Sequence, residues 1–219
     1  MRPSTVAGWL WGLCLLGGLS LPSLAEAGVA ESPAPPTETR KVEGKSFVLL
    51  GSGSAGEYQL SLYVEETEAR RHFPALVMRA GGKGRAKLNA GDHAQTFVVW
   101  GRFTKLLILR PAHPLVGTKL REMFATALVE ELADKASPEV KQRAEALLAL
   151  LARDLVETDE LQLLVDGDGR VTIDLHGDRR DAPPSPRAVR DLLSLWLGPK
   201  AVSAELRRAL VDKIELLGK

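Results

Sequence analysis

Residues 57–65 alternate between two kinds of side chain. One row holds Tyr58, Leu60, Leu62 and Val64, and the other holds Gln59, Ser61 and Tyr63. Successive side chains of a β-strand point to opposite faces, so a period of two predicts a strand with one face in a hydrophobic core. The chain must therefore contain a sheet that packs against an apolar layer.

Three glycines precede this strand. Gly51, Gly53 and Gly56 have the spacing G-x-G-x-x-G of a dinucleotide-binding turn. That turn requires a helix after the third glycine, because the helix N-terminus faces the pyrophosphate. A strand follows Gly56 instead, so nucleotide binding is not expected. The glycines are predicted to form a tight link between this strand and a preceding one over residues 45–50.

The rest of the chain alternates between strand and helix patterns. Residues 66–80 are predicted to be a helix containing Pro74, and residues 95–100 and 103–110 to be a β-hairpin. Helical spacing follows over residues 115–132, and Ser137 is predicted to cap the next helix. A hairpin over residues 161–175 and two final helices complete the order.

This order predicts an α+β fold: a mostly antiparallel sheet with helices layered on one face. The second of the final helices is expected to begin at Ser203.

The N-terminus has the pattern of a secretory signal peptide. Arg2 precedes an apolar stretch over about residues 7–21, and Ala25 and Ala27 form a cleavage site. The apolar stretch is shorter than the roughly 18 residues of a spanning helix. We therefore expect a signal peptide over 1–27, a Pro-rich disordered linker over 28–41, one domain over 42–219, and a secreted or periplasmic location. Cys14 is the single cysteine, so the mature chain would have none.

Composition excludes several functions. The 29 Lys and Arg balance 28 Asp and Glu, and no basic stripe with aromatic residues is present, so nucleic acid is not an expected partner. The four histidines are scattered, and the sequence DGDG lacks the rest of a calcium loop. No metal, no cofactor and no catalytic residues are predicted.

The element order and several local sequences resemble the chalcone isomerase-like family, in its bacterial secreted branch. The similarity extends from about Val42 to Leu217. It is carried by LLGSGSA, YQLSLYV, GRFTKLLILR, VGTKLREMFATALVEEL and LLSLWLGPKAVSAELRRAL, in this order. The resemblance implies an open-faced sandwich. Family members are intramolecular lyases (isomerases) or non-catalytic fatty-acid-binding proteins.

The resemblance also implies where a ligand would bind. The family places an arginine at the end of a G-x-G-V-R stretch, and Ala55 stands there in this sequence. Tyr63 matches the family's strand tyrosine. The implied function is non-catalytic binding of a hydrophobic small molecule, such as a fatty acid, between sheet and helices. The expected ligand-binding residues are Tyr63, Ser61, Arg102 and Arg110.

Two alternatives stay open at this point. One is an isomerase or other intramolecular lyase with a relocated arginine, supplied by Arg79, Arg85, Arg102 or Arg110. Enzymatic activity therefore stays open, although the missing family arginine argues against it. The other is a protein-interaction module without a ligand.

Tyr63 also has two possible orientations: toward solvent, if the apolar row packs on the helices, or toward the ligand cleft, where its hydroxyl could donate to a head group.

Overall fold

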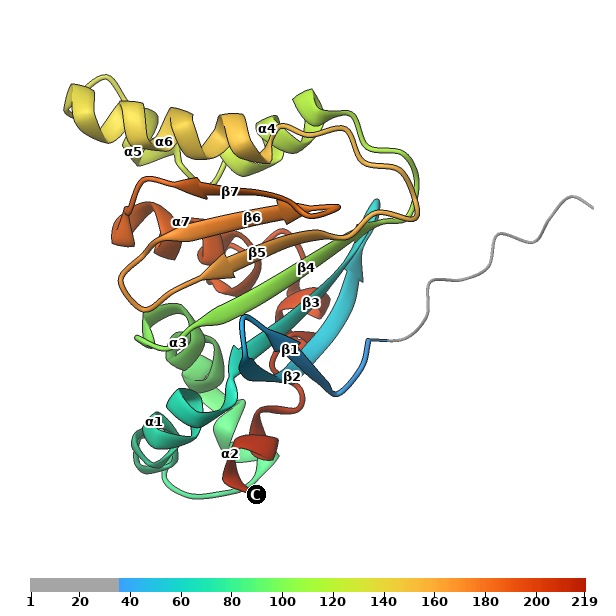
Figure 1. Ribbon diagram of the computed structural model, residues 1–219. Helices are drawn as coiled ribbons and strands as arrows, with labels where there is room; N and C mark the ends of the chain where they lie inside the picture. The colour runs from blue at the N-terminus through green and yellow to red at the C-terminus, as the bar shows by residue number, and fades with distance from the viewer. Residues whose placement is uncertain (1–35) are drawn as a thin grey trace, which may run out of the picture. The chain divides into compact units, whose positions relative to one another are not determined.

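The computed structural model of the chain describes residues 36–219 (Figure 1). The signal peptide predicted over 1–27 and most of the linker predicted over 28–41 lie outside the described residues. Within residues 36–219, no helix combines the length and the apolar character that crossing a lipid bilayer requires.

Seven antiparallel strands form one sheet in which neighbours in the chain are neighbours in space (Figure 1). They are β1 (Thr39–Val42), β2 (Lys45–Ala55), β3 (Tyr58–Glu65), β4 (Lys105–Pro111), β5 (Leu161–Val165), β6 (Val171–Leu175) and β7 (Asp178–Ala182). The alternation in β3 is confirmed, because the row that begins with Tyr58 is buried in the main hydrophobic core.

Helices supply the other side of that core. They are α1 (Glu66–Arg79), α2 (Arg85–Leu88), α3 (His93–Trp100), α4 (Gly117–Ala125), α5 (Val129–Leu132), α6 (Pro138–Leu151), α7 (Pro186–Leu197) and α8 (Ala204–Ala209), with short 3-10 turns η1 (Ala90–Asp92) and η2 (Ile214–Gly218). The side chains of Ser137 and Ser203 cap α6 and α8 as predicted. The predicted α+β class, with helices layered on one face of the sheet, is confirmed.

One predicted hairpin is wrong. Residues 95–100 belong to helix α3, whose C-terminus is marked by the Gly101 N–H donating to Phe97 O. Short apolar runs do not distinguish a strand from a buried helix by period alone. The helix predicted over 115–132 is also interrupted, between α4 and α5, whereas Pro74 lies inside α1 without ending it.

The glycines of β2 have a different role from the one predicted. Gly51 and Gly53 lie within the strand, and the link to β3 falls at Gly56 and Glu57. A Cβ atom added to Gly51 would overlap the backbone oxygen of Ala209 in α8. The glycines therefore let β2 approach α8 closely enough for the Lys213 N–H to donate to Leu50 O at 2.7 Å.

A second, smaller hydrophobic cluster covers the opposite face of the sheet. It consists of Phe47, Leu49, Tyr63, Leu106 and Ile108, with Val42 and Leu164 at its edge. Because β1 contributes Val42, the N-terminal strand helps to shield this face from water.

Candidate functional site: a groove between α1 and α3

A groove of about 300 Å³ lies between helices α1 and α3. Its walls are largely apolar and aromatic. The lining residues are His72, Ala75, Leu76, Arg79, His93, Thr96, Phe97, Trp100, Gly101 and Arg102. Trp100 is 63% exposed, which is unusual for so large an apolar side chain and leaves an aromatic surface for a ligand.

Two arginines give the groove a positive charge. Arg79 lies in the last turn of α1, and Arg102 follows the end of α3. Neither makes an ion pair or a side-chain hydrogen bond with any other residue between 36 and 219. An unpaired guanidinium offers a planar fork of donors to a carboxylate or a similar anion. The groove thus combines apolar contact area with two cationic side chains.

The indole of Trp100 also contacts a residue of α7. The guanidinium of Arg190 lies 4.6 Å from the centre of its ring, and Arg190 Nε donates to Pro186 O at 3.1 Å. Cations over an aromatic face are attracted by its negative potential. This contact therefore links α7 to the Trp100 side chain of α3.

At β3 and β4, the cleft predicted between sheet and helices is filled with side chains. Leu60 and Leu62 of β3 and Leu107 and Leu109 of β4 face the helices, and each is at most 1% exposed. No water-sized space therefore lies against these four side chains. A ligand reaches apolar surface more readily in the α1–α3 groove.

Three predicted site residues lie on the other face of the sheet, away from the groove. Tyr63 is fully buried, and its hydroxyl donates to the backbone oxygen of Thr37 at 3.1 Å. Neither orientation expected for Tyr63 is observed, because the segment before β1 covers it. Ser61, on the same face of β3, is 1% exposed.

Arg110 is engaged by an internal carboxylate. Its Nε donates to Glu160 Oε1 at 2.9 Å, and Arg40 of β1 donates to the same carboxylate at 3.0 Å. Burial alone would raise the pKa of Glu160, but the hydrogen bonds from Arg110 and Arg40 hold the pKa below its usual range. Arg110 Nη1 and Gln59 Oε1 are buried without a hydrogen-bond partner.

Among the four predicted residues, the groove includes Arg102. Its aromatic lining was missed because residues 95–100 were assigned to a strand. A signal was available: His93, Thr96, Phe97 and Trp100 are spaced i, i+3, i+4 and i+7, as on one face of a helix.

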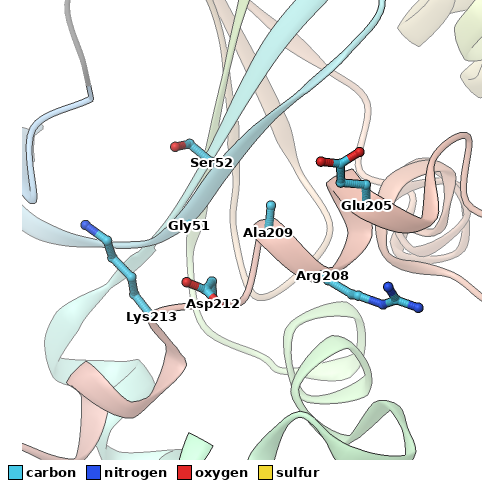
Figure 2. A pocket seen from close by; sticks show the side chains of 7 residues that line it. All are labelled: Gly51, Ser52, Glu205, Arg208, Ala209, Asp212 and Lys213. Carbon is cyan, nitrogen blue, oxygen red and sulfur yellow. The ribbon is translucent and has the colours of Figure 1, made fainter.

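Two further pockets have a different character. One, of about 330 Å³, lies beside the contact between β2 and α8 (Figure 2). In this view the charged ends of Arg208, Glu205 and Lys213 point in different directions, so they do not converge on one ligand group. The other, of about 280 Å³, is lined mainly by charged residues of both signs from β2, β7 and the turns that join β1 to β2 and β5 to β6. Residues 36–219 contain no cluster of three or more His, Asp or Glu side chains that could hold a metal ion.

Comparison with known proteins identifies the fold. No protein-family model matches the chain, and no curated protein matches it in sequence. The crystal structure of a fatty-acid binding protein from Arabidopsis thaliana superposes with a TM-score of 0.62 at 13% identity, covering 82% of this chain and 98% of the plant chain. At this identity the similarity concerns the fold alone. The chain therefore adopts the chalcone isomerase-like fold.

Proposed function

We propose that the protein is a secreted or periplasmic, non-catalytic member of the chalcone isomerase-like fold that binds a hydrophobic small molecule with an acidic head group, such as a fatty acid. The observation that carries this proposal is the apolar α1–α3 groove with its two unpaired arginines. The fatty-acid-binding plant protein of the same fold supports it, and the signal-peptide pattern supports the location.

The groove favours a ligand with a single chain. Ligand pockets generally span about 300–1,000 Å³, so a volume of about 300 Å³ lies at the lower limit. Leu76, Phe97 and Trp100 offer surface to an alkyl or aromatic body, and Arg79 and Arg102 offer donors to its acid group. A diacyl lipid would leave most of its apolar area in water.

Replacement of Arg102 by glutamine should weaken the binding of dodecanoate about tenfold, because a hydrogen bond to a charged group contributes about 1.5–3 kcal/mol. Isothermal titration calorimetry measures the affinity, and dodecanol, which lacks the charge, should bind equally well to both proteins. Arg208→Gln is the matched control, since this exposed arginine lies outside the groove. Equal losses for Arg102→Gln and Arg208→Gln would contradict the assignment.

The natural ligand and the processing site can be examined in one preparation. Native mass spectrometry of protein taken from the host envelope should show a bound hydrophobic acid. Peptide analysis of the same sample should place the mature N-terminus at Gly28, because Ala25 and Ala27 form the cleavage site. An intact Met1 on membrane-bound protein would disprove the processing prediction.

The two alternatives give different results. Ala55 occupies the position of the family arginine, so chalcone cyclisation is expected to stay at the rate in buffer. A saturable rate that is lost in Arg102→Gln would instead identify an isomerase with a relocated arginine. The filled interface between sheet and helices favours the interaction-module alternative, which would be supported if the wild-type protein bound neither dodecanoate nor dodecanol.

A further inference from the structure

A buried lysine lies directly behind the groove. Lys105, the first residue of β4, is 2% exposed. Its Nζ donates hydrogen bonds to the carbonyl oxygens of Gly101 at 2.7 Å and Phe103 at 2.8 Å. These two residues flank Arg102. The ammonium group therefore holds the backbone on both sides of a groove arginine.

The same turn is tied down from other directions. The Thr104 N–H donates to the Glu68 carboxylate of α1 at 3.3 Å. The backbone oxygen of Arg102 lies so close to Gly167 that a Cβ atom there would overlap it. With Lys105 in place, contacts on several sides thus restrain the backbone that carries Arg102.

Lys105 also supports the aromatic wall of the groove. Its Nζ lies 4.6 Å from the centre of the Phe103 ring. Phe103 is fully buried, and its ring centre is 4.9 Å from that of Phe97 and 6.2 Å from that of His72. Both of these rings line the groove. Lys105 therefore supports two parts of the site: the turn that carries Arg102, and, through Phe103, the aromatic wall.

This charge is costly to bury. Burial lowers the pKa of Lys105 to about 8, and the negative charges of Asp166 and Glu68 offset only part of that effect. An apolar side chain of similar length would avoid the desolvation cost, but it could not donate to the two carbonyl groups. Burial of the Lys105 ammonium group thus lowers stability, but its two hydrogen bonds hold the backbone on either side of Arg102.

We propose that Lys105 is a positioning residue of the groove: it fixes the turn that carries Arg102 and thereby raises the affinity for an anionic head group. Lys105 touches no ligand and acts through Arg102. This inference rests on the proposed function, because Arg102 must contact the acid group for its position to affect binding.

The test is a double-mutant cycle on the full mature chain with dodecanoate and dodecanol as probes. Lys105→Met should bind dodecanoate about five-fold more weakly than the wild type. Without Lys105, Arg102 is no longer held in position, so its charge-assisted hydrogen bond to the carboxylate is weakened. Dodecanol affinity should be unchanged. The double variant Lys105→Met/Arg102→Gln should bind dodecanoate no more weakly than Arg102→Gln alone, because the two residues act as one unit.

A readout without ligand separates the two proposals. Amide hydrogen exchange over residues 101–104 should be faster in Lys105→Met than in the wild type. If the wild type binds neither probe, the proposed function fails. If amide exchange over residues 101–104 is the same in Lys105→Met and the wild type, the role of Lys105 is overturned, whatever the binding result. Equal weakening for both probes, or additive losses in the double variant, would also overturn it. Should Lys105→Met not fold, Lys105→Gln, which keeps an N–H donor on a shorter chain, replaces it in each comparison.

Discussion

Replacement of Gly51 by alanine is expected to lower the free energy of unfolding by about 3 kcal/mol, the upper part of the range for overpacked interiors. The added methyl group would overlap Ala209 O and lie 2.8 Å from the carbonyl carbon of Leu210. These are backbone atoms, so no side-chain rotation relieves the overlap. β2 and α8 must separate, and the hydrogen bond from Lys213 N to Leu50 O is strained or lost. Urea denaturation followed by far-ultraviolet circular dichroism measures the change.

Two neighbouring variants serve as controls for Gly51→Ala. Ser52→Ala removes only a hydroxyl group, from the opposite face of β2, and should change stability by less than about 0.5 kcal/mol. Gly56→Ala introduces a side chain at a φ of +60° with nothing within 4 Å, so it reports backbone strain alone, about 1 kcal/mol. If Gly51→Ala were no more destabilising than Gly56→Ala, the close contact with α8 would not limit this position.

Arg187→Met should also lower the free energy of unfolding by about 3 kcal/mol at neutral pH. Glu131 of α5 has a side chain only 1% exposed, and Arg187 Nε lies 2.9 Å from its Oε1. The N–H does not point along this line, so the carboxylate has an ion pair but no hydrogen bond. Removal of Arg187 leaves a buried carboxylate next to Asp191 of α7 without compensation. The estimate lies at the low end for buried pairs because Arg187 is 63% exposed.

The loss of stability in Arg187→Met, relative to the wild type, should become smaller as the pH falls. Burial first, and then the nearby negative charge of Asp191, raise the pKa of Glu131 above its ordinary value. A carboxyl group whose pKa is higher in the folded state than in the unfolded state binds its proton more tightly when folded. Its stabilising contribution is complete below the ordinary glutamate pKa and is lost as the pH rises through the folded pKa.

Urea denaturation at intervals between pH 7 and pH 4 tests this dependence. In the double variant Glu131→Gln/Arg187→Met, this site should not make the free energy of unfolding depend on pH, because an amide does not ionise. Arg121→Met, which breaks an exposed pair with Glu145, should change stability by less than about 1 kcal/mol at any pH. A deficit of Arg187→Met that is the same at both ends of the range would contradict the role of the Glu131 charge.

Several elements could be predicted from neighbouring residues alone. The alternation in β3 depends on the pleat of a strand, and the caps of α6 and α8 depend on a serine oxygen that accepts from an N–H three residues later. The hairpin of β5 and β6 forms around an Asp-Gly turn. In each of these the interacting groups lie close together in the chain, so the pattern that encodes them is visible in a short window.

The candidate site depended on contacts between distant segments. Residues 95–100 form a continuous apolar run, and whether such a run is a strand or a buried helix is settled by the surfaces that it meets. With α3 assigned to a strand, Phe97 and Trp100 could not be placed beside α1. Arg79 and Arg102 were both possible sources of the relocated arginine, but neither has a local feature that distinguishes it from other exposed arginines.

The sequence by itself determined the face of each β3 side chain, the starts of helices α6 and α8 and the α+β class, because these follow from local backbone geometry and from the period of apolar residues. Only the tertiary structure decided what each face meets. Tyr63 lies on the predicted side of its strand, yet Thr37 covers it, and Arg110 is neutralised by Glu160, 50 residues away. The glycines of β2 have the spacing of a nucleotide turn, but the close approach of α8 explains them. Such pairings depend on the packing of segments far apart in the chain, and no local pattern specifies them.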